Sequence, residues 1–236
     1  MSSPKTLLLL SLLIFLGFDP SISAREIRAI FLNGSQDSPQ TAYLHSKEFS
    51  ETIHLPRKIL SPSTTVPNGN LSFAVLSQAP AEEEEVLIPE NAQIVTIPKE
   101  WTRCILLFVP KSQNTEFPAA VYPINASGDS FPSGHTMIYN FSQNSIAGKF
   151  GEQVVMIAAG SKAIIGEPRE GRGSYRVDMA CELPTHENPV VFYGTSWMHY
   201  PDRKQLMFIT PPTGNRKTPT IRLVLDSRTP SSNSTS

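Results

Sequence analysis

The sequence predicts an all-β protein built from two immunoglobulin-like β-sandwich domains in tandem after a signal peptide. Short segments with apolar residues at every second position follow one another along most of the chain, which is the period of a half-buried strand. The 21 Pro and 13 Gly residues are scattered between these segments, so they mark many turns. After the leading apolar run, every stretch with helical apolar spacing is interrupted by Pro or Gly, and we expect almost no helix.

The segment 1–24 has the composition of a secretory signal peptide. Lys5 precedes an apolar run over 7–16, and the small residues of 21–24 suit a cleavage site. The run is about half of the roughly 20 residues that a membrane-spanning helix needs, and no second run of that length follows it. We therefore expect an exported, water-soluble chain that begins near Arg25 and has no transmembrane span.

The numbers of basic and acidic residues are almost equal, which bears on the kind of partner the protein binds. The chain has 20 Lys and Arg residues against 21 Asp and Glu residues, which gives a net charge of −1 at pH 7. So small a net charge gives no electrostatic reason to bind nucleic acid or an anionic membrane. We expect neither as a partner.

The first domain is predicted to span 25–110. Its clearest strand, 71–75, has apolar residues at alternate positions and follows Asn68-Gly69, the strongest turn dipeptide of the chain. The segment 104–109 is apolar on both faces, which predicts a central strand. The other strands expected in this domain are 26–32, 49–55 and 94–97.

The strand pattern stops between residues 77 and 91. The run 82–85 consists of Glu alone, and like charges in a row are typical of a solvated loop. A calcium-binding loop would interleave its oxygen ligands with turn-forming Gly, which is missing from this run. We expect a loop here and not a cation site.

The polar segment 111–119 has no periodicity and is the predicted linker to a second domain over 120–228. The residues 229–236 are too polar to be buried and are predicted to be a disordered tail. The turn residues of 200–203 lie between two strong strands and predict a hairpin with a type I turn. The strands expected in the second domain are 121–124, 137–141, 154–158, 163–166, 174–183, 190–197, 205–210 and 220–225.

Cys104 and Cys181 are the two cysteines of the chain. Export would permit a disulfide between them. The alternative is a pair of buried free thiols, because both residues lie in apolar strand patterns.

The string Pro-Ser-Gly-His-Thr over 132–136 resembles the central motif of the acid-phosphatase and lipid-phosphatase superfamily. In that superfamily the His and the backbone amides help to stabilise a phosphate. The family's further motifs are missing: Lys111 has no Arg-Pro pair after it, and Ser196 has no Arg after it. The string is therefore interpreted as a turn in which Gly134 leads into a strand.

Other catalytic or metal-binding patterns are also incomplete. A serine hydrolase elbow needs Gly-x-Ser-x-Gly, and the segment 194–198 around Ser196 lacks the second Gly. The histidines are dispersed singly, so no metal site and no cofactor is predicted; they are His45, His54, His135, His186 and His199.

Trp197, His199 and Tyr200 lie close together in the sequence and are candidates for a binding patch that stacks on a sugar. The alternative for Trp197 is a place in the core at the end of a sandwich strand. Asparagine sequons, which matter only in a eukaryotic secretory pathway, begin at Asn33, Asn70, Asn125, Asn140 and Asn233.

Several segments together resemble a group of uncharacterised exported bacterial β-sandwich proteins, and the first half is similar to a bacterial immunoglobulin-like domain of unknown function. The resemblance implies a sandwich fold and an exported location, and it supplies no catalytic residue. The segments that carry it are 25–32, 37–39, 61–69, 101–109, 195–199, 201–203 and 216–219.

The leading functional hypothesis is an exported, non-enzymatic β-sandwich protein with a binding or scaffolding role at the cell envelope. Its partner would be an envelope protein or a glycan. The alternative is an exported hydrolase, phosphatase-like or esterase-like, that uses Ser133 or Ser196 with a histidine. A pocket joining a Ser, a His and an acid within hydrogen-bond reach would favour the alternative.

Overall fold

The computed structural model describes residues 24–80, 88–111, 116–183 and 186–226. The expected signal peptide, apart from Ala24, lies outside the described residues, as do the Glu run 82–85 and the expected tail 229–236. All regular secondary structure in the described residues is β-strand, so the all-β prediction is confirmed. The part of the chain that the structure covers contains no helix suited to spanning a membrane.

The first eight strands form two four-stranded sheets. Their orders are β4-β1-β7-β8 and β3-β2-β5-β6. The strands are β1 (Arg25–Phe31), β2 (Thr41–His45), β3 (Ser50–His54), β4 (Thr64–Val66), β5 (Leu71–Leu76), β6 (Gln93–Ile97), β7 (Arg103–Pro110) and β8 (Ala119–Asn125). We refer to β1–β8 as the first half.

The last eight strands repeat this arrangement, and we refer to β9–β16 as the second half. The sheet orders are β12-β9-β15-β16 and β11-β10-β13-β14, and β9 runs parallel to β15 just as β1 runs parallel to β7. The strands are β9 (Thr136–Asn140), β10 (Ile146–Phe150), β11 (Gln153–Ile157), β12 (Lys162–Ile165), β13 (Gly173–Cys181), β14 (Val190–His199), β15 (Lys204–Thr210) and β16 (Thr220–Asp226).

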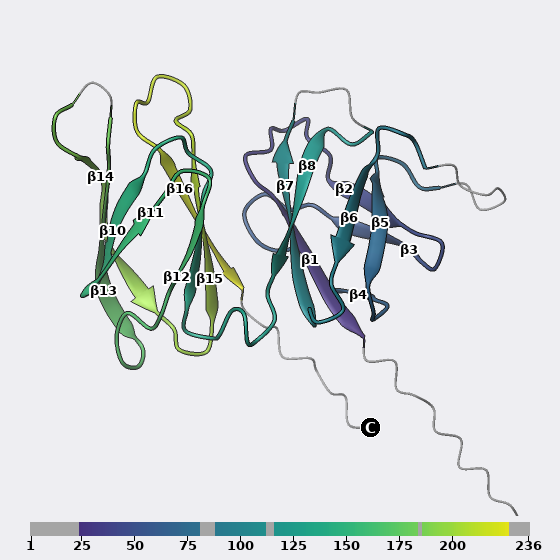
Figure 1. The fold of residues 1–236 in the computed structure, drawn as a ribbon, viewed down its shortest axis with the longest axis horizontal. Coiled ribbons are helices and arrows are strands. Elements are labelled where there is room, and N and C mark those ends of the chain that lie inside the picture. The colour runs from purple at the N-terminus through teal and green to yellow at the C-terminus, as the bar shows by residue number, and fades with distance from the viewer. Residues whose placement is uncertain (1–23, 81–87, 112–115, 184–185, 227–236) are drawn as a thin grey trace, which may run out of the picture.

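The four sheets are stacked as four layers, and three hydrophobic clusters lie between them. We call these clusters the first, middle and third cores. The first core fills the first half, and the third core fills the second half. The middle core lies between the halves, which stand side by side in Figure 1. It consists of Ile30, Leu32, Leu60, Ile105, Leu107, Ile124, Ala126, Phe131, Met137, Leu206, Phe208 and Val224.

The strands next to the middle core are buried on both faces. In β7, Leu106 and Phe108 face the first core while Ile105 and Leu107 face the middle core. This explains the doubly apolar segment 104–109, which is indeed a central strand, since β7 pairs with β1 and β8. β15 follows the same rule, and its residues are all buried.

The passage between the halves differs from the expected linker. The segment 111–119 joins β7 to β8, which are hydrogen-bonded neighbours in one sheet. Residues 120–125 therefore belong with the first half, and the chain crosses to the second half between Asn125 and Thr136. The physical reason is that β8 buries Val121 in the first core and Ile124 in the middle core.

Some local expectations also need correction. The turn at 200–203 is present, because the Arg203 amide donates to the Tyr200 carbonyl over 3.1 Å. It is not a hairpin, since β14 and β15 belong to different sheets. β2, β4 and β10 are additional strands that the apolar pattern did not indicate; β4 is only three residues long, and β10 contains Gly148.

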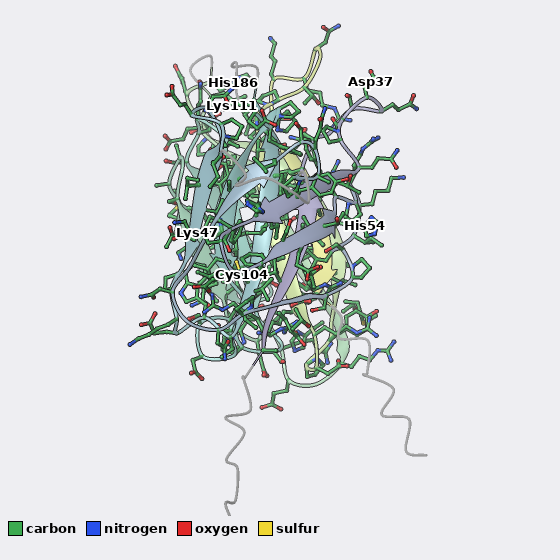
Figure 2. All side chains as sticks on the ribbon, turned by 90° about the vertical axis from the view of Figure 1, so that its right-hand side faces the viewer. Asp37, Lys47, His54, Cys104, Lys111 and His186 are labelled. Carbon is green, nitrogen blue, oxygen red and sulfur yellow. The ribbon has the colours of Figure 1, made fainter. Side chains whose placement is uncertain are left out.

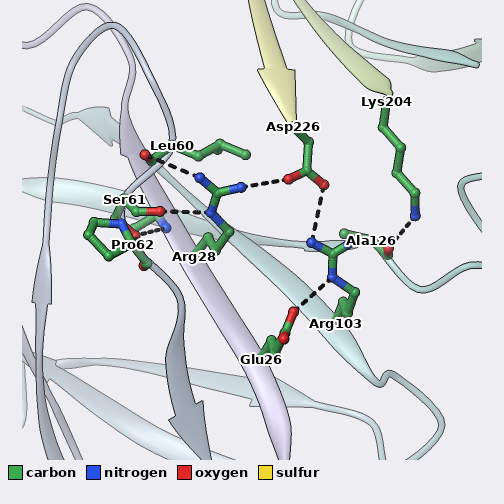
Figure 3. A network of polar contacts seen from close by, with 10 residues as sticks. Glu26, Arg28, Leu60, Ser61, Pro62, Arg103, Ala126, Lys204 and Asp226 are labelled. Atoms are coloured by element: carbon green, nitrogen blue, oxygen red, sulfur yellow. Dashed lines mark hydrogen bonds and ion pairs between the residues drawn. The ribbon is translucent and has the colours of Figure 1, made fainter. Parts of the chain in front are cut away.

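Charged groups from both halves meet beside the middle core (Figure 3). Asp226, whose side chain is 1% exposed, accepts from Arg28 over 2.7 Å and lies 3.5 Å from Arg103. Arg103 also pairs with Glu26 over 3.1 Å. Lys204 of the second half donates to the Ala126 carbonyl over 2.8 Å, so polar contacts as well as apolar ones join the halves.

Gln93 ties the edges of the two sheets of the first half together. Its side-chain amide donates to the Val121 carbonyl over 2.7 Å, and its side-chain oxygen accepts from the Val121 amide over 2.9 Å. β6 and β8 are both edge strands, so one side chain satisfies backbone groups that would otherwise face solvent at this edge.

We expect Asp226→Asn to lower the free energy of unfolding by about 3 kcal/mol, because it leaves two largely buried guanidinium groups without their shared carboxylate. Denaturant titration measures this change. Glu152→Gln is the control: Glu152 forms an exposed pair with Lys149, and its loss should leave the midpoint unchanged. Equal midpoints for Asp226→Asn and the wild type would show that Asp226 contributes little.

We expect the two halves to unfold in one cooperative transition, because the middle core is shared between them. The two Trp residues report on each half separately: Trp101 packs against the first core and Trp197 lies in the third. Fluorescence of Trp101→Phe and of Trp197→Phe therefore follows one half each. Each variant should show a fluorescence midpoint that coincides with its own circular-dichroism midpoint. Separate transitions would mean that the halves are energetically independent.

Candidate functional site

Trp197 is part of the third core and is only 7% exposed. Its ring makes edge-to-face contacts with Phe150, Tyr175 and Tyr193 at centroid distances of 6.0, 6.3 and 6.0 Å. Its indole N–H donates to the Tyr193 hydroxyl over 2.9 Å. The ring is therefore held in the interior and is not available to stack on a sugar.

His199 and Tyr200 do not complete an exposed aromatic patch either. His199 is 3% exposed and lies on the same inward face of β14 as Trp197. Tyr200 follows the strand, and the guanidinium carbons of Arg172 and Arg203 lie 5.1 and 4.7 Å from its ring centre. Of the three sequence candidates, two are buried and the third is in contact with arginine.

His199 is a buried titratable group at the end of β14 that, within the described part of the chain, lacks a hydrogen-bond partner at one ring nitrogen. Its Nε2 atom is buried and has no hydrogen-bond partner among the described residues. Burial lowers the pKa of His199; Glu167 opposes this effect, while Arg169 and His135 add to it. The described residues contain no group of three or more His, Cys, Asp or Glu side chains that could hold a metal ion.

The string at 132–136 forms a turn that enters β9. Gly134 has φ of +77°, and its amide donates to the Arg203 carbonyl over 2.8 Å. The Nδ1 atom of His135 lies 2.9 Å from the carbonyl oxygen of Ser133. These contacts agree with the interpretation of the string as a turn, since Gly supplies the left-handed conformation.

The serines of the hydrolase alternative are not oriented for catalysis with a nearby histidine. Ser196 is exposed on the outer face of β14, whereas His199 is buried on the inner face. Ser133 contacts His135 through its carbonyl and not through a reactive hydroxyl. A nucleophile needs its hydroxyl within hydrogen-bond reach of a base, and these two pairs do not provide it.

Both cysteines are free and buried, so the disulfide alternative does not hold. Cys104 belongs to the first core and Cys181 to the third, with the middle core between them. Figure 2 places Cys104 within the body of the first half. Burial raises the pKa of Cys104 to about 12, which keeps its thiol protonated and unreactive.

Two of the asparagine sequons have structural roles. Asn140 is 1% exposed, and its side-chain amide donates to the carbonyls of Asn144, Ile157 and Ala158. The Asn125 amide donates to the Ser130 hydroxyl over 2.8 Å. A glycan on Asn140 would require these buried contacts to break.

The outer face of the sheet β11-β10-β13-β14 is the feature that the sequence did not indicate. Val154, Met156 and Val191 are 73%, 63% and 68% exposed on it. Strand register aligns Met156, Ala147, Ala180 and Val191 in one row across all four strands. We call this set the apolar row.

Beside the apolar row, the register aligns Lys149 of β10 with Asp178 of β13. Asp178 pairs with Arg176 over 2.6 Å, and Arg176 keeps the pKa of Asp178 below its ordinary value. The small residues at the centre leave a shallow hollow of about 200 Å³, whose rim includes Val154 and Val191. The face therefore combines exposed apolar side chains, a hollow, the cationic side chains of Lys149 and Arg176 and the acid Asp178.

Sequence reasoning missed this face because a period-two pattern does not tell which face of a strand is covered. Val154, Val155, Met156 and Ile157 are apolar at consecutive positions, and such a run usually means burial on both faces. In the structure the sheet that contains β11 is an outermost layer, so only one of its faces meets the third core.

No protein-family model matches the chain, and no curated protein is significantly similar to it. The candidate site therefore rests on the geometry of the outer face.

We expect the protein to lose stability as the pH falls below about 6.5, the ordinary pKa of histidine. Because the pKa of His199 is lowered in the folded state, the unfolded state takes up the proton first, and acid favours unfolding. Denaturant midpoints between pH 7.5 and 5 would be compared for the wild type and His199→Gln. The wild type should show the steeper loss; identical slopes would contradict this role for His199.

We expect Gly134→Val to lower the free energy of unfolding by about 2 kcal/mol, because a β-branched residue disfavours positive φ. A Cβ atom at this position would also lie 3.1 Å from the Glu167 side chain. Gly128→Ala is the control, since that position has open space and Gly128 is not among the positive-φ glycines. Thermal unfolding compares the loss of stability in the two variants. Equal losses would contradict the idea that the positive φ of Gly134 matters for the stability of the turn.

Proposed function

We propose that this chain is an exported, non-enzymatic protein with tandem immunoglobulin-like β-sandwiches and a binding or scaffolding role at the cell envelope. The observation that carries the proposal is the apolar row on the outer face of β11-β10-β13-β14. The N-terminal pattern supports export. The shared strand order of the two halves supports two copies of one sandwich unit.

The apolar row supports binding because such contiguous surfaces are costly in water. Single exposed apolar side chains are normal, but clustered ones rimmed by polar groups mark interaction sites. Burying a Val or Met side chain contributes roughly 1.5–3 kcal/mol, so covering Val154, Met156 and Val191 supplies a useful free energy of association.

The middle core supports a scaffolding component of the role. It joins the two halves through buried apolar residues, and Asp226 adds ion pairs to Arg28 and Arg103. Halves joined in this way hold the outer face in a fixed direction relative to the first half. A binding surface that is already ordered loses less conformational entropy when a partner docks.

The hydrolase alternative has less support. Ser196 and His199 lie on opposite faces of β14, and Ser133 contacts His135 by its backbone carbonyl. The buried Nε2 of His199 is the feature most like a catalytic base, yet burial lowers its pKa without a serine beside it.

We expect the mature protein to co-sediment with isolated cell envelopes, and Val191→Glu to reduce the bound fraction at least about tenfold by placing a charge in the contact. Ile94→Glu is the matched control, since Ile94 is 53% exposed in the first half. Equal binding by all three proteins would contradict a role for this face. Hydrolysis of a phosphate or acyl ester that disappears in Ser133→Ala or Ser196→Ala would instead favour the enzyme.

A further inference from the structure

The outer face of β11-β10-β13-β14 is complementary to itself. We propose that it binds the same face of a second copy of this chain about a two-fold axis. The axis lies between the two facing sheets, runs parallel to the strands, and passes over the boundary between β10 and β13. The inference rests on the proposed binding role of this face and names its occupant. An interface of this kind uses the same patch on both copies, so every contact occurs twice.

The two-fold axis follows from the order and register of the strands. It places β10 over β13 of the second copy and β11 over β14 of the second copy. Each row of residues that are register partners across the four strands then faces the same row of the second copy. Within the apolar row, Met156 then lies opposite Val191 of the second copy, and Ala147 lies opposite Ala180. Apolar side chains thus meet apolar side chains along the whole row.

The charged positions are also matched by this axis. Lys149 on β10 lies opposite Asp178 of the second copy, and Asp178 lies opposite Lys149. Both side chains are partly exposed and already have flanking partners, Glu152 at 3.8 Å and Arg176 at 2.6 Å, so neither is withdrawn into the protein interior. Opposite charges brought together on association favour the correct pairing and disfavour others.

The hollow at the centre of the face makes room for the contact. Ala147, Gly148 and Ala180 are among its lining residues, and their small size leaves the space open. Met156 of the second copy stands at the edge of this hollow, and its unbranched side chain adapts to irregular gaps. Met156 and Val191, at the two ends of the apolar row, therefore have room to lean toward its centre without forcing the two sheets apart.

The size of the face predicts weak association. Four strands about 4.8 Å apart give a width of about 19 Å, and such a face buries less than the roughly 800 Å² per partner of a standard stable interface. We expect a dissociation constant between about 10 μM and 1 mM in solution. Weak pairing of this kind becomes effective where many copies are concentrated on one surface.

Sedimentation velocity of the mature chain, from about 5 μM to 1 mM, tests the proposal. The wild type should shift from monomer to dimer. Lys149→Glu brings acids together and Asp178→Lys brings cations together, so each variant alone should weaken dimerisation more than about tenfold. An equimolar mixture of the two variants should dimerise again, because each copy then offers the charge that the other lacks.

Matched charge changes elsewhere control for net charge. Lys58→Glu and Glu51→Lys alter exposed residues of the first half, and both should dimerise like the wild type. Restored dimerisation in the mixture supports the proposal and cannot result from misfolding of a single variant. Dimerisation that is unaffected by Lys149→Glu and Asp178→Lys overturns it, as does a wild type that stays monomeric up to about 1 mM.

The same proteins separate this inference from the proposed function. A monomeric wild type whose envelope binding is lost in Val191→Glu overturns the second copy as occupant and leaves the binding role intact. Dimerisation without any envelope binding supports pairing between copies and contradicts the role at the envelope.

Discussion

The rest of the structure depends on the burial of both faces of the two central sheets. An ordinary two-sheet sandwich hides one face of each sheet and leaves the other to water. Here each of the sheets β4-β1-β7-β8 and β12-β9-β15-β16 packs one face on the core of its own half. Their other faces pack against each other, and the middle core fills the space between them. In the strands that carry this contact, residues 104–108 of β7 and every residue of β15 are consequently buried.

The ion pairs beside the middle core fit this arrangement. Asp226 is the last residue of β16. It contacts Arg28 of β1 and Arg103 of β7, which are the central strands of the sheet β4-β1-β7-β8. Charges are expensive to bury, and these remain acceptable because each has a partner at the margin of the apolar contact.

Much of the fold follows from local sequence patterns, and the remainder depends on contacts between distant segments. Alternation at 71–75 and the doubly apolar run at 104–109 are properties of single strands, so both were predictable. The place of β8 with the first half, and the separation of β14 from β15 into different sheets, depend on pairings that no local pattern specifies. Trp197 shows the same limit, because a large aromatic residue near a strand end suits either a core or a binding surface.

The candidate site was invisible in the sequence for a related reason. The apolar row consists of one residue from each of four strands, and only their register brings them into line. Its members, two alanines, a valine and a methionine, carry no chemical signature that a motif search would find. Turn chemistry is different: Gly134 could be assigned correctly because its conformational freedom is a property of one residue.

The side chain of Gln93 has a consequence for how this protein behaves when it is crowded among other chains. Unpaired backbone groups at the rim of a sheet are a template onto which any extended polypeptide can add, and this is a common start of aggregation. By occupying both the amide and the carbonyl of Val121, Gln93 takes the place that such an intruding strand would need. The first half is thereby protected from adventitious strand addition at β8.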